Sequence, residues 1–183
     1  MDIGAERWGA TSQPARRTLG ISALACLAIE TSEPTSLRFR LLGAIEAEVD
    51  DRILDLGGRK QRALLGALLL RAGEVLPDDR LIDEIWGESP PASAAHSLEA
   101  YVSRLRQLLV PHGVILERRG GGYRIGLGRA ILDSRVFEAL VDESIQASAA
   151  GDDTRAATLA KEALGLWHGR VLSGIPLHLD GRA

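Results

Sequence analysis

The sequence is poor in cysteine and has no long apolar run. Cys26 is the single cysteine among 183 residues, so the chain can form neither an internal disulfide nor a metal cage built from cysteines. Such low cysteine usage fits a reducing compartment, and we expect a cytoplasmic location. The apolar run from Leu19 to Ile29 has 11 residues, which is too short to cross a bilayer. The sequence therefore predicts no membrane partner.

The same apolar run follows Arg16-Arg17, and a dibasic start of this kind resembles a secretory signal peptide. However, Ala28-Ile29-Glu30 is a poor cleavage site for such a peptide. We therefore favour a disordered or weakly helical N-terminal extension over residues 1–35, with a signal peptide as the alternative.

Catalytic and metal-binding patterns are also missing. No P-loop and no nucleophile-elbow pattern occurs, and the three consecutive glycines lie between two strand-like runs rather than before a helix. The histidines have no cysteine or carboxylate at metal-ligand spacing. They are scattered over the chain at His96, His112, His168 and His178. We expect no enzyme activity, no metal and no cofactor.

Charge is unevenly distributed along the chain. The formal net charge of −3 is unlike that of a typical nucleic-acid binder. Between residues 95 and 130, however, six arginines stand against two acidic residues, a local charge of +4, whereas residues 131–183 carry −3. The basic part of the chain is therefore its middle, where a polyanion would bind.

Residues 90–110 carry an amphipathic helical pattern. Stepping about 100° per residue from Leu98 gathers the apolar residues on one side: Leu98, Tyr101, Val102, Leu105, Leu108 and Leu109. The opposite side carries His96, Ala100, Ser103, Arg104 and Gln107, with Ser97, Glu99 and Arg106 on its flank. A helix that is small at its centre and cationic toward its end suits a major groove. An ordinary surface helix would show the same periodicity.

Two strand-like runs follow this helix, at residues 114–119 and 123–127, and glycines separate them. This order predicts a β-hairpin whose tip, Gly120 to Gly122, lacks side chains and can approach another molecule closely. Arginines crowd the hairpin at Arg118, Arg119, Arg124 and Arg129. A helix followed by a basic hairpin favours a wing that reaches the minor groove or the phosphates. A solvated hairpin without function is the alternative.

The remaining patterns are typical of a small mixed domain and a helical pair. Alternation predicts an antiparallel sheet from residues 37–42, 45–49 and 53–56, followed by helices over 59–72 and from Pro77 onward. Gly66 interrupts the first helix, where close packing would explain it. The connection Gly87 to Pro91 is expected to be an exposed loop. Residues 134–149 and 154–167 predict two antiparallel helices like one tetratricopeptide unit, which cannot bury its own apolar face.

The segments GGRKQRALL, RLIDEIWG, YVSRLR and GGGYR together closely resemble the OmpR/PhoB-type winged helix. Within that class, the sequence from Leu37 to Trp167 is similar to that of the SARP regulators, the antibiotic regulatory proteins of streptomycetes. The resemblance implies an α+β fold, with a winged helix-turn-helix that has an N-terminal antiparallel sheet and a β-hairpin wing. It divides the chain into an extension over 1–35, a winged-helix domain over 36–130 and a bacterial transcriptional activation domain over 131–183.

The resemblance also implies a function. Family members activate transcription at direct repeats in double-stranded DNA, and they contact RNA polymerase and its sigma factor partly through the loop before the recognition helix. The family pattern assigns Ala100 and Arg104 to base edges, Ser97 and Arg106 to phosphates, and Arg119 to the minor groove. Tyr123 is expected to pack under the wing rather than stack on a base. Adjacent copies are expected to associate on DNA, and secondary-metabolite control is the expected role.

Two departures from the family pattern leave alternatives open. The chain carries an extension before Leu37, and its activation domain stops after about one helical pair, where the family normally continues. A shortened competitor without activation is therefore one alternative. A winged helix that binds a protein partner is another, although the +4 segment counts against it; binding that does not depend on salt would support it.

Overall fold

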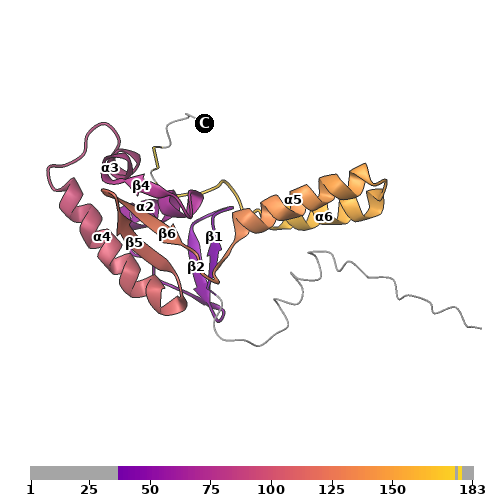
Figure 1. Cartoon of the computed structure of the whole chain (residues 1–183), viewed down its shortest axis with the longest axis horizontal. Coiled ribbons are helices and arrows are strands. Elements are labelled where there is room, and N and C mark those ends of the chain that lie inside the picture. The colour runs from indigo at the N-terminus through magenta and orange to yellow at the C-terminus, as the bar shows by residue number, and fades with distance from the viewer. Residues whose placement is uncertain (1–36, 176, 179–183) are drawn as a thin grey trace, which may run out of the picture. The chain divides into compact units, whose positions relative to one another are not determined.

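The computed structural model describes residues 37–175, 177 and 178, so the predicted extension over 1–35, with Cys26, lies outside the described residues. The α+β class is confirmed (Figure 1). The elements are β1 (Arg38–Arg40), β2 (Glu46–Val49), β3 (Arg52–Ile53), α2 (Arg59–Leu70), β4 (Val75–Pro77), α3 (Asp78–Trp86), α4 (Ala94–Leu109), the 3₁₀ turn η1 (Val110–His112), β5 (Ile115–Arg119), β6 (Gly122–Gly126), β7 (Ile131–Leu132), α5 (Asp133–Ala149) and α6 (Asp153–Gly165).

The N-terminal sheet has the strand order β3-β2-β1-β7. Its first three strands are antiparallel as predicted, and Asp50 and Asp51 form the two-residue turn between β2 and β3 with φ of 48° and 60°. Asp tolerates this left-handed region better than most residues, and such a turn matches the twist of the strands. The sheet is not purely antiparallel, because β7 pairs parallel with β1. Two residues are too short to show a period, so the sequence did not reveal β7.

The wing is a sheet of three strands, ordered β4-β6-β5, rather than a hairpin alone. Leu76 pairs with Tyr123 and Pro77 with Gly122, so the segment before α3 forms an edge of the wing. Pro77, which the sequence placed in the first turn of a helix, ends this edge strand and immediately precedes α3. Proline has no N–H to donate and is compatible with an edge strand. The wing is thereby tied to the start of α3.

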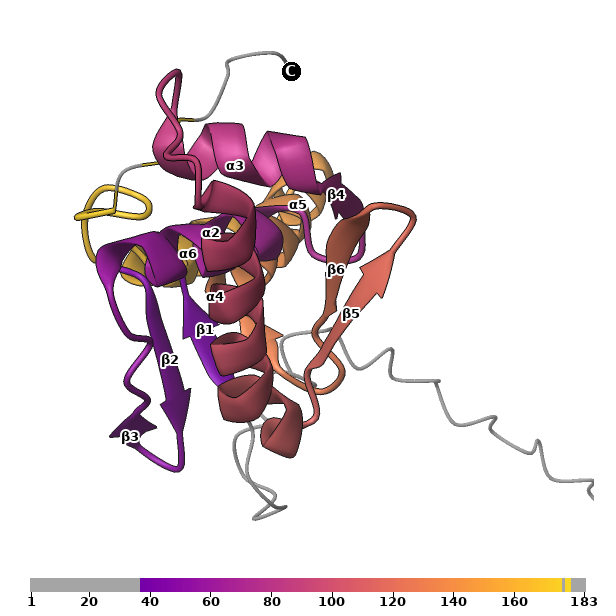
Figure 2. The ribbon, with the colours of Figure 1, turned by 90° about the vertical axis from the view of Figure 1, so that its left-hand side faces the viewer.

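Helices α2, α3 and α4 pack together over the two sheets and enclose the core (Figure 2). Helix α4 buries the apolar stripe that its 3.6-residue period predicted. Helices α2 and α3 also bury apolar side chains, but Leu70 of α2, expected on the buried face, is 38% exposed. Asp78 and Asp79 lie in the first turn of α3, where negative charge interacts favourably with the helix dipole. The largest fully buried side chains are Phe39, Leu37, Leu41, Leu64, Leu65, Leu68, Leu69, Leu81, Ile85, Leu98, Leu105 and Leu109.

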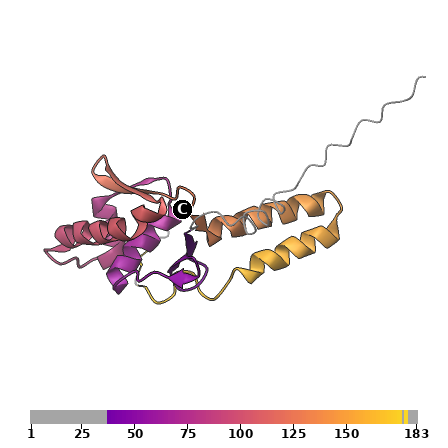
Figure 3. The same cartoon turned by 90° about the horizontal axis from the view of Figure 1, so that it is seen from below.

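Helices α5 and α6 form the predicted antiparallel pair and lie side by side (Figure 3). Their contact is made by small and apolar side chains, of which Ala147, Leu159 and Ala163 are buried. The Asp152 side chain caps α6 by accepting a hydrogen bond from the Arg155 N–H at 3.0 Å. Other apolar side chains remain exposed, namely Ile145 of α5, Leu164 of α6 and Trp167, which follows the end of α6.

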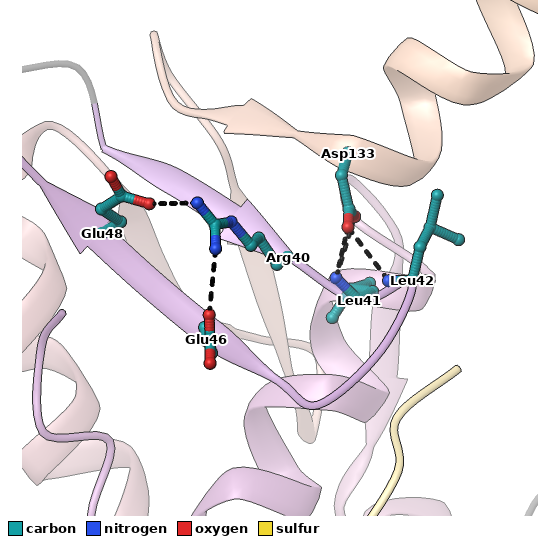
Figure 4. A network of polar contacts seen from close by, with 6 residues as sticks. All are labelled: Arg40, Leu41, Leu42, Glu46, Glu48 and Asp133. Atoms are coloured by element: carbon teal, nitrogen blue, oxygen red, sulfur yellow. Dashed lines mark hydrogen bonds and ion pairs between the residues drawn. The ribbon is translucent and has the colours of Figure 1, made fainter. Parts of the chain in front are cut away.

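Asp133, the first residue of α5, ties the helical pair to β1 (Figure 4). Its carboxylate accepts hydrogen bonds from the Leu41 N–H at 2.8 and 2.9 Å and from the Leu42 N–H at 3.0 Å. These two donors follow the end of β1 and would otherwise lack a strand partner. On the same strand, Arg40 pairs with Glu46 at 3.3 Å and with Glu48 at 2.7 Å across β2.

The segment after α6 returns to the winged helix. The His168 N–H donates to the Leu42 carbonyl at 2.7 Å, and the Leu172 N–H donates to the Leu41 carbonyl at 3.0 Å. Leu172 is buried and joins the core. A Cβ atom at Gly66 of α2 would lie 3.1 Å from the Leu172 side chain, which explains the glycine inside that helix. The expected close packing at Gly66 is confirmed.

Candidate nucleic-acid interface

Helix α4 presents two different faces (Figure 2). Leu98, Val102, Leu105 and Leu109 are buried, while Tyr101 and Leu108 are partly buried against the core. The other face is open: His96, Ser103, Arg104 and Gln107 are exposed, and Ser97 and Ala100 are partly exposed. The stripe predicted from the helical wheel is therefore the buried one, and the predicted contact face lies toward solvent.

The two predicted arginines of α4 are held differently. Arg104 is exposed and makes no hydrogen bond or ion pair with any other described residue. Arg106 is partly buried, and its Nε–H donates to the Leu116 carbonyl of β5 at 2.7 Å. Its guanidinium carbon lies 5.9 Å from the centre of the Tyr123 ring. Arg104 is thus free to bind a ligand, whereas Arg106 also fastens the helix to the wing.

The wing tip is the two-residue turn Gly120–Gly121, since Arg119 pairs with Gly122. Both turn residues have positive φ, 52° and 81°, as the type I′ hairpin turn requires. A Cβ atom on either one would meet no neighbour, so the tip is open to another molecule. Position 122 requires glycine for a different reason, because a Cβ there would collide with the Leu76 carbonyl of β4. The third glycine serves the packing of the wing itself.

Alternation along β5 sorts the wing arginines onto two faces, because successive side chains of a strand point to opposite sides. Glu117 and Arg119 share the outer face with Arg124 of β6. The Glu117 carboxylate lies 2.9 Å from Arg119 Nε and 2.8 Å from an Arg124 Nη. The Arg119 side chain is 59% exposed, so the ion pair leaves most of its surface to solvent.

Arg118 lies on the inner face of the wing. One Nη donates to the Tyr123 hydroxyl at 2.7 Å, and the other pairs with the Asp78 carboxylate of α3 at 2.6 Å. The hydrogen bond to Asp78, followed by the one to Tyr123, raises the pKa of Arg118 above its ordinary value. Tyr123 is 3% exposed, so its predicted position under the wing is confirmed.

The sequence reading missed this cluster of Asp78, Arg118 and Tyr123. The two-residue alternation of β5 could have separated Arg118 from Arg119. No local signal connects Arg118 with Asp78, because the two residues are 40 positions apart.

Of the loop predicted to be exposed, Gly87 to Pro91, the residues from Glu88 onward are exposed, and the exposure continues to Ser93, whereas Gly87 is partly buried. At its base, Trp86 stacks on Tyr101 of α4 with ring centres 6.2 Å apart. Lys60 of α2 approaches Trp86 and donates to the Ile85 carbonyl. The base of the loop is therefore packed against α2 and α4, and His178 lies beside its first residue, Gly87.

Within the described part of the chain, no three histidine, cysteine or acidic side chains come together as a metal site would require. None of the described helices is both long and apolar enough to cross a membrane.

Comparison with known families gives two matches. A family model described as "Transcriptional regulatory protein, C terminal" matches residues 46–125. A second, described as "Bacterial transcriptional activator domain", matches residues 132–182. The first match contains α4 and most of the wing, and the second contains the helical pair.

Individual proteins agree with these matches. The chain is 42% identical over 147 residues to Regulatory protein AfsR of Streptomyces coelicolor, covering 80% of this chain and 15% of AfsR. It is 30% identical over 145 residues to Regulatory protein DnrI of Streptomyces peucetius, covering 74% of this chain and 53% of DnrI. A solved structure of Mycobacterium tuberculosis EmbR, in complex with a low affinity phosphopeptide, matches with a TM-score of 0.72 and 34% identity. That match covers 75% of this chain and 38% of the EmbR chain.

The fold and these matches define a class: a transcriptional regulator in which an OmpR/PhoB-type winged helix precedes a bacterial transcriptional activator domain. Over both domains the chain is similar to SARP regulators of this class, of which AfsR and DnrI are two. It spans between about one sixth and about half of the length of the AfsR and DnrI relatives.

Proposed function

We propose that this chain binds double-stranded DNA sequence-specifically, with α4 in the major groove and the β5–β6 wing at the adjacent minor groove. The observation that carries the proposal is the open face of α4, where Arg104 has no partner among the described residues, beside a wing with a bare glycine tip. A helix in the major groove with a basic arm in the minor groove is a common arrangement of DNA-binding domains.

Each predicted residue has a role in this arrangement. Ala100 and Arg104 read base edges, since an arginine can form a bidentate pair with guanine. Ser97 and Arg106 contact phosphates, and the Arg106 Nη groups remain available for this while Nε holds Leu116. Arg119 enters the minor groove, where narrow A·T-rich sequences attract arginine.

The regulatory part of the proposal is activation at direct repeats of promoters, in the cytoplasm and in control of secondary metabolism. The exposed loop Gly87 to Pro91 would contact RNA polymerase and its sigma factor. Copies on adjacent repeats would associate, and the exposed Ile145, Leu164 and Trp167 of the helical pair offer an apolar surface for this. A competitor that binds the same sites without activating is the second candidate.

The test is genomic footprinting with the purified full chain, followed by transcription in vitro from the best site. DNA binding predicts protected direct repeats and an affinity that falls steeply with salt. Binding that does not change with salt would instead indicate a protein-interaction module. Occupied repeats without added transcripts would indicate the competitor.

A further inference from the structure

Arg118 connects three elements of the winged helix. It lies on β5, its Nη groups reach Tyr123 of β6 at 2.7 Å and Asp78 of α3 at 2.6 Å, and its guanidinium carbon lies 5.0 Å from the centre of the Tyr123 ring. A planar guanidinium offers donors in a fixed fork, so one arginine can hold two partners at once. Lysine, a single point of charge, could not satisfy the same two partners in this way.

The wing tip is attached to the start of α3 at a second point. The Asp78 N–H donates to the Gly121 carbonyl at 3.2 Å, and Pro77 pairs with Gly122. Asp78 therefore holds the tip through its backbone and holds Arg118 through its side chain. The other carboxylate oxygen of Asp78 is buried and has no hydrogen-bond partner among the described residues. Arg118 is thus the group that compensates this carboxylate.

Tyr123 extends the connection to α4. Two guanidinium carbons lie near the centre of its ring, that of Arg118 at 5.0 Å and that of Arg106 at 5.9 Å. Arg106 in turn donates to the Leu116 carbonyl of β5. The cluster Asp78, Arg106, Arg118 and Tyr123 therefore joins α3, the wing and the recognition helix, and it lies beside both proposed DNA contacts.

We propose that Arg118 is a positioning residue: held by Asp78 and Tyr123, it sets the wing tip relative to α4 so that Arg119 reaches the minor groove. This rests on the proposed binding of DNA. Arg118 acts through Arg119 and does not itself contact DNA, because each of its Nη groups already binds a partner within the protein, Tyr123 or Asp78.

The direction in which Asp78→Asn changes DNA binding distinguishes a positioning role of Arg118 from a direct contact with DNA. Asp78 carries negative charge near a polyanion. The loss of this charge in Asp78→Asn would, considered alone, strengthen DNA binding by reducing repulsion. If Arg118 bound a phosphate directly, releasing it from Asp78 would strengthen binding further. A positioning role predicts the opposite: the wing tip loses its attachment, and the contribution of Arg119 is lost with it.

The experiment compares full chains carrying Asp78→Asn and Asp79→Asn. Asp79 is exposed in the same first turn of α3, so it matches the change of charge and the loss of helix-dipole stabilisation without touching the wing. The probes are duplexes with the best footprinted site and either A·T-rich or G·C-rich flanks. Asp78→Asn should reduce the preference for A·T-rich flanks by about threefold to tenfold, the size of one lost arginine contact. Asp79→Asn should leave that preference unchanged.

Two further variants complete the test. Arg119→Ala should lower the preference in the parent chain but add nothing to Asp78→Asn, because both changes remove the same contact. Arg118→Lys in the parent chain should keep only part of the preference, because lysine cannot hold Asp78 and Tyr123 in the same fork geometry. Stronger binding by Asp78→Asn on both flanks, or full additivity with Arg119→Ala, would overturn the proposal while leaving DNA binding intact.

Amide exchange in the free chain tests the attachment without DNA. Protection of the amides at the wing tip, residues 119–122, should fall in Asp78→Asn and stay at the parent level in Asp79→Asn. Equal protection in the two variants would overturn the attachment. A parent chain that shows salt-independent binding or none would instead contradict the proposed function, and the exchange result would still decide the role of Asp78.

Discussion

Leu172 anchors the segment that returns from α6 to the winged helix, and Leu172→Ala should destabilise the winged helix itself. The side chain is 7% exposed and packs in the same core as α2. Truncating a buried leucine costs about 2–5 kcal/mol in transfer free energy and cavity formation. Leu172 has a φ of 53°, and alanine keeps this left-handed backbone equally strained, so the change reports on the side chain alone.

Urea denaturation followed by far-ultraviolet circular dichroism measures this loss, and amide exchange over residues 61–69 locates it. The matched control is Leu164→Ala on α6, where the leucine is 68% exposed. It should change the free energy of unfolding by at most about 0.5 kcal/mol. Losses of similar size in the two variants, or unchanged exchange in α2, would refute the assignment of Leu172 to this core.

Gly66 provides a reciprocal test of the same contact. Alanine inside a helix is favoured over glycine by about 1 kcal/mol. At Gly66, however, the new Cβ would lie 3.1–3.2 Å from the Leu172, Ile175 and Leu177 side chains. Gly66→Ala should therefore destabilise the parent chain, and it should destabilise less beside Leu172→Ala, which removes one of the three close contacts. Additive effects of the two changes would contradict the contact.

The remaining predictions concern DNA. Arg104→Ala should cost about 1–3 kcal/mol of binding and relax specificity at one base pair, whereas Arg106→Ala should weaken all sequences alike and lower the salt slope by about 1; binding to a panel of single-base site variants separates the two results. Arg119→Ala should weaken binding most at A·T-flanked sites in a gel-shift assay, and equal losses on G·C flanks would indicate a plain phosphate contact. A chain starting at Ser36 should bind with unchanged affinity because residues 1–35 share no pattern with the rest, and a tenfold loss on deletion would place part of the binding there.

The elements that could be predicted from the sequence are those with a local signal. The 3.6-residue period predicted the buried stripe of α4, and the glycines predicted the turn of the wing. Strands β4 and β7 have only three and two residues, and neither lies in an alternating run like the one that marked β1. Their pairing joins distant segments: Leu132 pairs with Phe39, and Leu76 pairs with Tyr123. Only the closed fold brings such partners together.

For the site, the sequence distinguished the faces of a helix but not the internal partners of its charges. Arg104 points to solvent as the wheel predicted. Arg106 was assigned to phosphates alone, yet its Nε also holds Leu116. Arg118 counted as one more positive charge, although Asp78 neutralises it from 40 residues away. A count of charges along the chain cannot show which of them are already paired in the fold.

Glu117 pairs with two arginines of the wing at once and so restrains both of them. Its carboxylate lies 2.9 Å from Arg119 and 2.8 Å from Arg124. Glu117→Gln removes one negative charge from the proposed interface, releases Arg124 toward phosphate and frees Arg119 for the minor groove. Affinity should therefore rise and the salt slope should steepen by about 0.9, the value for one additional phosphate neutralised.

The control for Glu117→Gln is Asp153→Asn, which changes the net charge equally but lies in the first turn of α6, outside the proposed interface. Fluorescence anisotropy across a series of salt concentrations measures the salt slope of each variant. Only Glu117→Gln should have a slope that differs from that of the parent chain. Surface ion pairs contribute little to folding stability, so the loss of these two pairs should leave the fold intact and the comparison clean. Weaker binding by Glu117→Gln would show that Glu117 aims Arg119 at the groove instead of holding it back, and the reasoning from released charge would fail.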